Sequence, residues 1–191
     1  MEPFKKIKSV VTPLDKVNVD TDQIVPKQFL KLVQKTGFGQ YLFYDWRFEN
    51  GDKPREDFVL NNPKYHDSKI LLTRDNFGCG SSREHAAWAL LDYGFRVIIS
   101  SSFADIFYDN CFKNGILPIK LDSQTIEKLF KNLYEIEVDL ENQTMKTDGK
   151  TIYFEIEGHR KKTLLEGLDD IAITLQYADK ITQYEKSKTQ F

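Results

Sequence analysis

The sequence predicts an α/β domain with a parallel βαβ core. Three short apolar segments, residues 70–73, 95–100 and 116–121, are separated by two segments in which apolar residues recur at helical spacing. Strand, helix and strand within about thirty residues is the pattern of a crossover unit, in which the two strands run parallel and the connection is right-handed. We therefore expect these three strands to be parallel neighbours.

A second observation predicts an antiparallel hairpin late in the chain. Polar and apolar residues alternate strictly in residues 134–140 and again in residues 151–157, which is typical of strands with one solvated face. The polar segment between them contains Asp148 and Gly149, a favoured hairpin pair. A chain of 191 residues can bury a substantial core. We expect a single domain over residues 1–191, with a C-terminal helical extension from about residue 160.

The chain begins with a strand-like segment and a polar loop. Residues 4–14 mix lysines with β-branched residues, and Pro13 predicts an edge strand or the end of a strand. The loop that follows carries Asp15, Asp20 and Asp22. Clustered carboxylates suit hard cations, but the register of a calcium loop is absent, so we favour turn and cap roles over a metal site.

The next segments are less regular. Residues 27–34 predict a short helix that ends near Gly37 and Gly39. The aromatic residues between 41 and 48 are interleaved with one acidic and one basic residue, and we expect them to cover a core or to form a contact between subunits. Residues 49–67 are polar and contain prolines, which predicts a connector.

The later helices have recognisable start signals. Ser102 is expected to cap a helix over residues 104–113, and Asp122 or Ser123 a helix over residues 124–133. Apolar residues at helical spacing between 164 and 175 predict a further helical region. The polar tail from Lys180 is expected to fray.

Composition excludes several classes of function. The 27 basic and 29 acidic residues give a net charge of −2, so no nucleic-acid footprint or polybasic membrane surface is expected. Two cysteines, Cys79 and Cys111, are too few for a disulfide framework or a self-contained metal centre. The N-terminal segment lacks a signal peptide's apolar stretch, and no apolar run approaches a membrane span. A reducing, cytoplasmic setting is expected.

The most informative segment is the turn at residues 78–83, between a predicted strand and a predicted helix. A turn of this kind directs backbone N–H groups and the positive end of the helix dipole towards one point, which favours an anion. The dinucleotide fingerprint fails because Arg83 stands where its third glycine would be, and the Walker pattern lacks its lysine. Neither nucleotide motif is therefore present.

Two other interpretations of this turn remain. Ser81 and Glu84 fit a capping box, which would make Ser81 structural. Alternatively, Arg83 supplies a planar fork for a carboxylate, the glycines allow close approach, and Ser81 is placed for proton transfer in a positive field. Only the second interpretation uses all the residues of the turn together.

The sequence resembles a known superfamily at this turn. Residues 78–86, Gly-Cys-Gly-Ser-Ser-Arg-Glu-His-Ala, are similar to the signature of the aconitase superfamily's swivelling domain. The resemblance includes residues 20–26, 29–31, 101–107, 110–111, 114–118 and 165–171. Over most of its length the chain resembles the separate small subunits of bacterial 3-isopropylmalate dehydratases. It implies a swivelling β/β/α domain.

The resemblance also implies an activity and a partner. In this family 2-isopropylmalate is isomerised to 3-isopropylmalate through a dehydrated intermediate in leucine biosynthesis, and a [4Fe–4S] cluster on the large subunit acts as Lewis acid. This chain would hold no cofactor or metal of its own. It would act as a hydro-lyase subunit only together with that large subunit, as a heterodimer.

The resemblance assigns roles to particular residues. Ser81 corresponds to the catalytic base. Gly80, Ser82 and Arg83 correspond to residues that bind a substrate carboxylate. Phe29, Leu30 and Lys31 correspond to residues that contact the substrate's variable side group. The family uses a second arginine from this domain, for which Arg47 and Arg74 are candidates.

Two nearby residues invite other assignments. His85 is expected to be a packed helix residue, because the family's catalytic histidines lie on the other subunit, and Cys79 is not expected to bind the cluster. Two alternatives to the main function remain: the small subunit of a related hydro-lyase of homoaconitase or citramalate type, and a free-standing anion-binding regulatory module.

Overall fold

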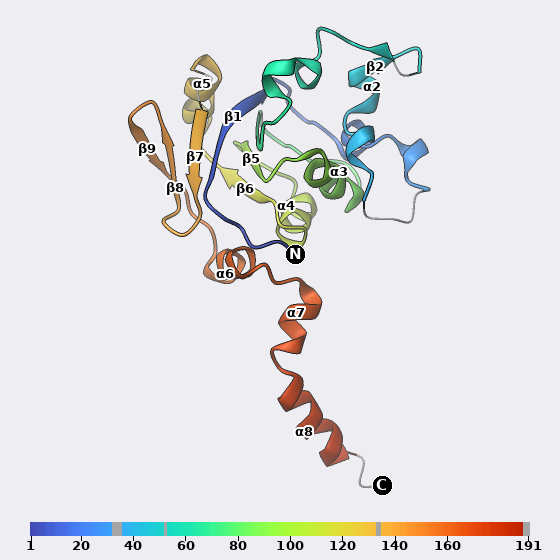
Figure 1. The fold of residues 1–191 in the computed structure, drawn as a ribbon, viewed down its shortest axis with the longest axis vertical. Helices are drawn as coiled ribbons and strands as arrows, with labels where there is room; N and C mark the ends of the chain where they lie inside the picture. Colours follow the sequence, from blue (N-terminus) through green and yellow to red (C-terminus); the bar gives the residue numbers. More distant parts are fainter. Residues whose placement is uncertain (32–35, 52, 133–134, 189–191) are drawn as a thin grey trace.

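The computed structural model describes residues 1–31, 36–51, 53–132 and 135–188. Its centre is a seven-stranded sheet with the strand order β6-β5-β4-β1-β7-β8-β9 (Figure 1). The strands are β1 (Ile7–Leu14), β4 (Ile70–Thr73), β5 (Val97–Ser100), β6 (Leu117–Lys120), β7 (Glu135–Asp139), β8 (Thr144–Thr147) and β9 (Lys150–Tyr153). The predicted α/β class is confirmed.

One half of the sheet is parallel. Strand β4 pairs with β1 on one side and with β5 on the other, and β5 pairs in turn with β6, all in parallel register. The crossover helices are α3 (His85–Tyr93) and α4 (Asp105–Lys113). The three predicted parallel strands are therefore confirmed, and β1 joins them as a fourth.

Strand β1 lies inside the sheet, so of the two predicted possibilities the edge strand is wrong, whereas the end of a strand is confirmed, because Pro13 is the last residue but one of β1. Its first half, Ile7 to Val10, pairs antiparallel with β7, and its second half, Val11 to Leu14, pairs parallel with β4. Pro13 lies beyond the residues that β7 pairs with, so its missing N–H interrupts no bond on that side. A proline at the end of one ladder is thus compatible with a central strand.

The other half of the sheet is an antiparallel meander. The predicted hairpin strands are present as β7 and β9, but they do not pair with each other, because β8 lies between them. The segment predicted to be a polar connection thus contains a strand. Asp148 and Gly149 form the turn from β8 to β9, both with positive φ (42° and 71°), as a tight hairpin turn requires.

Helices cover both faces of the sheet, and two buried clusters result. Leu71 and Ile98 pack on the face covered by α3 and by part of α4. Their neighbours Ile70, Leu72 and Val97 pack on the opposite face, with helices α5 (Ser123–Lys131) and α6 (Gly158–Glu166). This alternation is the two-residue period of strands that are buried on both sides. Asp122 caps α5, as expected, by accepting a hydrogen bond from Thr125 N.

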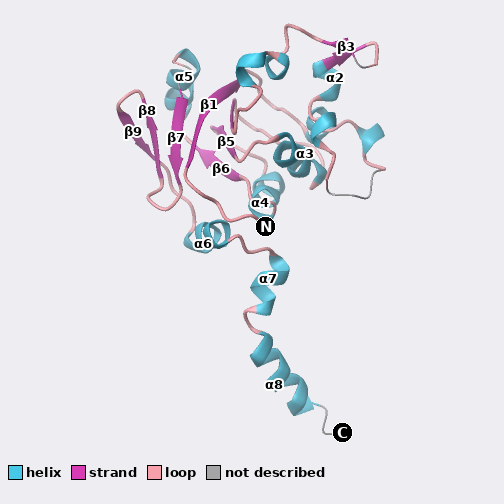
Figure 2. Cartoon of the chain, viewed as in Figure 1, coloured by secondary structure: helices cyan, strands magenta, loops and turns pink. Residues whose placement is uncertain are grey.

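The segment between β1 and β4 forms a layer over α3, at the upper right in Figure 2. Its elements are α1 (Thr21–Ile24), η1 (Lys27–Phe29), η2 (Gly39–Tyr41), α2 (Tyr44–Arg47), β2 (Phe48–Glu49), β3 (Lys53–Pro54), η3 (Val59–Asn61) and η4 (Pro63–Tyr65). Of the helix predicted over residues 27–34, only the 3₁₀ turn η1 is observed, and residues 32–35 lie outside the described residues. The aromatic residues cover the core as predicted: Phe43 is fully buried and stacks on Trp46.

The C-terminal helices extend away from this body (Figure 1). Beyond α6 the chain forms α7 (Asp170–Leu175) and α8 (Ala178–Lys188). The tail from Lys180 is helical to Lys188 instead of irregular. None of the described helices combines the length and the apolar character that crossing a membrane requires.

Gly78 allows a close contact between the turn after β4 and helix α4. Its φ is +77°, and a Cβ at this position would overlap the ring of Phe107. We expect Gly78→Ala to destabilise the chain by about 2–4 kcal/mol, because strain at positive φ adds to overpacking. Chemical denaturation measures this loss.

Gly149→Ala is the matched control. Gly149 also has a positive φ, +71°, but nothing lies within 4 Å of a Cβ there, so the substitution adds backbone strain without overpacking. Equal destabilisation by the two substitutions would contradict the proposed contact with Phe107.

Candidate active site

The turn between β4 and α3 lies against the loop that follows β1. Because β1 and β4 are parallel neighbours, their carboxyl ends meet at the same edge of the sheet. Gly78 N donates to Val19 O at 2.8 Å, and Thr21 N donates to Cys79 O at 2.9 Å. Asp20 and Cys79 form an isolated parallel bridge. The two loops thus continue the pairing of their strands and form one site.

The other side of the turn is held by the chain that follows β5. Phe77 N donates to Ser102 O at 3.1 Å, and Ala104 N donates to Phe77 O at 3.0 Å. Ser102 was predicted to cap α4, but Ala104 occupies the N-cap position, and Ser102 Oγ instead accepts from Asn76 N at 2.7 Å. The turn is therefore fixed from both neighbouring strands.

Ser81 does not cap a helix. Helix α3 begins at His85, and Glu84 occupies the cap position without a side-chain cap bond. The Glu84 carboxylate accepts from Asn114 Nδ2 at 2.8 Å instead of reaching back to Ser81. The capping-box interpretation is therefore wrong, and Ser81 is exposed at the surface.

Thr21 holds Ser81 through three contacts. The two hydroxyl oxygens, Thr21 Oγ1 and Ser81 Oγ, are 3.1 Å apart, and either can donate. Ser81 N also donates to Thr21 Oγ1 at 3.2 Å, and Thr21 Oγ1 can donate to Ser81 O at 3.2 Å. Thr21 is buried at the start of α1. The position of the Ser81 hydroxyl is thus set by a residue sixty positions away in the sequence.

The guanidinium of Arg83 is half-buried next to the same loop. Its Nη1 pairs with Asp22 Oδ1, and the second oxygen of Asp22 lies 3.3 Å from Lys27 Nζ. Two cations therefore share one carboxylate, and the group keeps a net positive charge. Arg83 has five N–H donors, so the fork retains donors for a second carboxylate.

Gly80 and Ser82 complete the turn. Gly80 has a φ of +93°, while a Cβ there would be at ordinary contact distance, 3.4 Å from Asp20 Cβ and Thr21 Oγ1. Its backbone conformation, more than lack of space, requires glycine. Ser82 is exposed beside Ser81 and Arg83. The turn combines two hydroxyls, a guanidinium and a helix N-terminus, which can bind a carboxylate and exchange a proton beside it.

The three aspartates of the first loop have individual roles. Asp20 forms a capping box at α1, where its carboxylate accepts from Gln23 N at 2.8 Å. Asp15 pairs with Arg74, and Asp22 with Arg83. Among the described residues, no group of three or more histidine, cysteine or acidic side chains is placed to hold a metal ion.

Phe29, Leu30 and Lys31 follow α1 on η1 and its end. Phe29 is half-buried and stacks on Tyr41, with ring centroids 4.0 Å apart, and Leu30 packs against the same cluster. Lys31 is exposed. In the described part of the chain, the ion pairs of Asp22 with Arg83 and Lys27 connect this segment to the turn.

Both candidates for a second substrate arginine are used elsewhere. Arg47 is half-buried, and its Nη1 donates to the carbonyls of Gly39 and Leu42; burial lowers its pKa. Arg74 pairs with two carboxylates, one in the first loop and Glu127 on α5. Among the described residues, neither guanidinium forms a hydrogen bond or ion pair with the turn. Lys27, which shares Asp22 with Arg83, is the additional cation that lies next to it.

His85 and the two cysteines are packed side chains. The His85 ring lies between Phe38 and Trp88, with centroid distances of 5.3 and 4.6 Å, and burial together with nearby Arg83 lowers its pKa. Burial raises the pKa of the Cys79 thiol, and nearby Asp20 raises it further. Complete burial raises the pKa of Cys111 well above its usual range. Both thiols are thus held in the neutral form.

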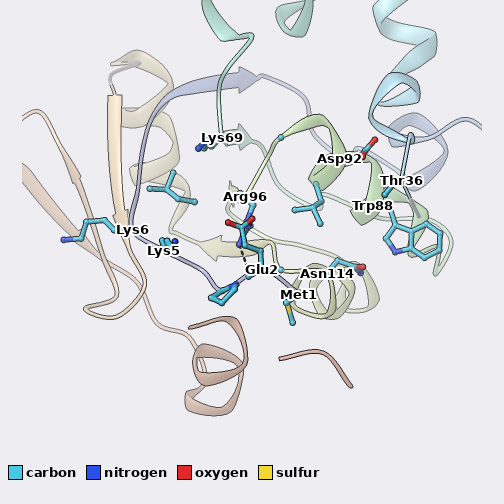
Figure 3. Close-up of a pocket in the computed structure, with 15 residues that line it drawn as sticks. Met1, Glu2, Lys5, Lys6, Thr36, Lys69, Trp88, Asp92, Arg96 and Asn114 are labelled. Carbon is cyan, nitrogen blue, oxygen red and sulfur yellow. Dashed lines mark hydrogen bonds and ion pairs between the residues drawn. The ribbon is translucent and has the colours of Figure 1, made fainter. Parts of the chain in front are cut away.

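A pocket of about 750 Å³ lies at the other end of α3 (Figure 3). Arg96 and Glu2, which both line it, form an ion pair with Nη1 and Oε2 3.0 Å apart. Trp88 and Asp92 of α3 line it, whereas the turn residues do not. The pocket is therefore separate from the site around Ser81.

Sequence reasoning missed Thr21, Asp22 and Lys27 as parts of this site. Thr21 and Asp22 were interpreted as turn and cap formers, and Lys27 as part of a helix. The segment around them belongs to the resemblance, which marks it as important without indicating what it contacts. Only the pairing of the two loops reveals their roles.

Two family models match the chain. The model of the aconitase C-terminal domain matches residues 1–124. The model of the C-terminal domain of the 3-isopropylmalate dehydratase small subunit matches residues 170–191. The first of these spans β1, α1 and the turn after β4, and the second the last two helices.

Curated proteins named 3-isopropylmalate dehydratase small subunit match nearly the whole chain. The protein from Brevibacillus brevis is 57% identical over 191 residues, covering 97% of this chain and 98% of its own length. Proteins from Aromatoleum aromaticum and Neisseria gonorrhoeae are 53% and 52% identical, covering 98% and 100% of this chain and 95% and 96% of theirs.

A solved structure has the same fold. The crystal structure of 3-isopropylmalate dehydratase from Methanocaldococcus jannaschii superposes with a TM-score of 0.70 at 26% identity. The match covers 95% of this chain and 99% of that chain.

Proposed function

The chain belongs to the aconitase C-terminal domain family and, within it, to the small subunits of 3-isopropylmalate dehydratase, a hydro-lyase; we propose that the turn at residues 78–83 is its part of the active site. One observation carries this proposal. An exposed serine hydroxyl is held by a buried threonine beside a half-buried arginine and the start of a helix.

The proposed reaction converts 2-isopropylmalate to 3-isopropylmalate in leucine biosynthesis. Ser81 Oγ, as the alkoxide, takes the proton from the carbon next to the one that bears the hydroxyl. The C–H electron pair becomes the new double bond, and hydroxide leaves. In the rehydration, hydroxide adds to the carbon that lost the proton, and Ser81 Oγ returns the proton to the carbon that lost the hydroxyl. Two features support the alkoxide: Thr21 Oγ1 can donate to it, and Arg83 with the start of α3 supplies positive potential.

We assign the substrate carboxylate beside Ser81 to Arg83, Ser82 and Gly80. The donors that Arg83 retains beside Asp22 support a bidentate contact, and the backbone of Gly80 allows close approach. Lys27 adds a cation next to this pair. We assign the variable side group to Phe29, Leu30 and Lys31, where the half-buried apolar residues support contact with an isopropyl group.

The described residues of this chain do not fit an iron–sulfur cluster. Cys79 is half-buried next to a glycine turn, and Cys111 is buried in the core. We therefore propose that a [4Fe–4S] cluster on the large subunit supplies the Lewis acidity for loss of the hydroxyl. A reducing, cytoplasmic setting suits the two unpaired thiols.

Ser81→Ala tests the base. In the complex with the large subunit, reconstituted anaerobically and assayed with 2-isopropylmalate, we expect kcat to fall about 10²–10⁴-fold because the proton acceptor is lost. Assembly, measured by co-elution of the subunits, should be unchanged. Ser82→Ala is the control and should raise KM more than it lowers kcat.

Full activity of the Ser81→Ala complex would remove Ser81 from the mechanism. Faster turnover of citramalate or homocitrate than of 2-isopropylmalate by the unmodified complex would instead transfer the proposal to that related hydro-lyase.

Thr21→Val tests whether Thr21 positions Ser81. The substitution keeps the shape of the buried side chain but removes the hydroxyl. We expect kcat to fall about tenfold, because the free energy of about one hydrogen bond is lost from the transition state. KM should be unchanged, and the isotope effect from substrate deuterated at the reacting carbon should increase. Thr21→Ser retains the hydroxyl and should restore most of the rate; equal loss in both variants would indicate a packing role only.

Arg83→Lys tests the carboxylate contact. Lysine keeps the charge and can pair with Asp22, but it loses the planar fork. We expect kcat/KM to fall about 10–100-fold, mainly through a higher KM, as for a lost charged hydrogen bond. Steady-state kinetics of the reconstituted complex measures both constants. Unchanged values of both would exclude a bidentate contact to the substrate.

A further inference from the structure

The last two helices expose an apolar stripe. We call residues 170–188, which contain α7 and α8, the C-terminal arm. Its large apolar side chains are exposed to solvent: Ile171 by 72%, Leu175 by 65%, Tyr177 by 52%, Ile181 by 40% and Tyr184 by 64%. A surface of this kind marks an interaction site when its residues are contiguous.

These residues share helix faces. Ile171 and Leu175 are four residues apart on α7, Tyr177 lies in the turn before α8, and Ile181 and Tyr184 are three residues apart on α8. On α8, Asp179, Gln183 and Lys186 lie on the side opposite to Ile181 and Tyr184, whereas Glu185 and Lys188 lie near these apolar residues. Helices of this length are marginal in water unless an apolar face is covered. The arm therefore has the pattern of a helix that docks on another surface.

The start of the arm is held firmly against the body. Gly167 ends α6 with a φ of +67°, and a Cβ there would be 2.8 Å from Pro3 Cδ. Phe4 N donates to Leu164 O at 2.8 Å, and Asp169 caps α7 by accepting from Ala172 N. The arm thus leaves the body in a defined direction (Figure 1).

We propose that the C-terminal arm docks on the large subunit of the dehydratase through this apolar stripe. The inference rests on the proposed function, in which that large subunit supplies the rest of the active site. The family model that matches residues 170–191 is the one named for small subunits, whereas the general aconitase C-terminal domain model matches residues 1–124. The arm is therefore the part that characterises a separate subunit, which has to hold its partner without a covalent link.

The curated relatives include the arm. The match to the Brevibacillus brevis protein covers 97% of this chain, and that to the Neisseria gonorrhoeae protein covers 100%. At 97% coverage only about six of 191 residues remain unmatched, fewer than the arm contains. The arm is thus a shared element of these small subunits and not an isolated tail.

The exposed area favours the large subunit over a second copy of this chain. Aromatic side chains offer about 150–250 Å² each. At the observed exposures, the five residues together offer on the order of 500 Å². A stable interface needs about 800 Å² per partner. Pairing of two arms through these side chains alone falls short of that area, whereas a partner that also contacts the body of the chain beside the arm can bury more.

The test is a double variant, Leu175→Glu and Ile181→Glu, called the stripe variant because both substitutions lie in the stripe. Glutamate is a good helix former, but its charge is unfavourable when it is buried against an apolar surface. We therefore expect the dissociation constant of the two subunits to rise about a hundredfold or more. Titration calorimetry with the purified large subunit measures it. At saturating concentrations of the variant, kcat should equal that of the unmodified complex.

The matched control is Gln176→Glu with Gln183→Glu, which adds the same charge at exposed positions away from the stripe. We expect its dissociation constant to stay within about twofold of the unmodified value. Equal melting temperatures and far-ultraviolet circular dichroism of both variants exclude unfolding as the cause.

Two outcomes overturn the proposal. One is an unchanged dissociation constant in the stripe variant. The other is a combined result: the unmodified chain self-associates in sedimentation, and the stripe variant no longer self-associates but binds the large subunit with unchanged affinity. The stripe would then be the contact between two copies of this chain. Failure of the proposed function is distinguishable, because it appears as full activity of Ser81→Ala in an assembled complex.

Discussion

The contact between the loop after β1 and the turn after β4 is the constraint on which the candidate site depends. It exists because the two strands are parallel neighbours, so their carboxyl ends reach the same edge of the sheet. Backbone bonds from Gly78 to Val19 and from Thr21 to Cys79 extend that pairing into the loops. The hydroxyl of Ser81 and the guanidinium of Arg83 are held by residues that this pairing brings close. Without it, the turn would be held only by the chain after β5, and Ser81 and Arg83 would lose Thr21 and Asp22 as partners.

The electrostatics of the site follow from the same arrangement. Asp22 accepts two cations, Arg83 and Lys27, so its own charge is more than compensated. The start of α3 adds positive potential at the same place. A carboxylate substrate would therefore meet an excess of positive charge although the chain as a whole carries a net charge of −2. Attraction of the ligand is local, as a nearly balanced composition requires.

In the proposed function the site is half of a larger one, and the exposure of its residues is consistent with that. Ser81 and Ser82 are exposed instead of enclosed in a cavity, and the described side chains provide no group for a metal. In the proposed function the large subunit supplies the enclosing walls and the metal chemistry. A rigid turn on one surface and an apolar arm leaving the body are two separate features that such a partner could engage.

Much of the fold could be predicted from local sequence, and the errors share one cause. Periodicity identified the parallel strands, the crossover helices and two strands of the meander, while Asp122 and the Asp148-Gly149 turn followed from local chemistry. The position of β1 inside the sheet and the insertion of β8 were missed, because strand order is not a local property. Likewise, Ser81 and Glu84 matched a capping box, but Glu84 binds Asn114, thirty residues later.

By itself the sequence determined which chemical groups the turn contains, because its glycines, serines and arginine all lie within residues 78–83. The tertiary structure decided how those groups are held. Thr21 lies sixty residues from Ser81, and Asp22 lies 61 residues from Arg83. It also showed that Arg47 and Arg74 are used elsewhere. Contacts over such separations depend on which strands become neighbours. The strand order is determined by burial of apolar residues over the whole sheet and not by any one segment.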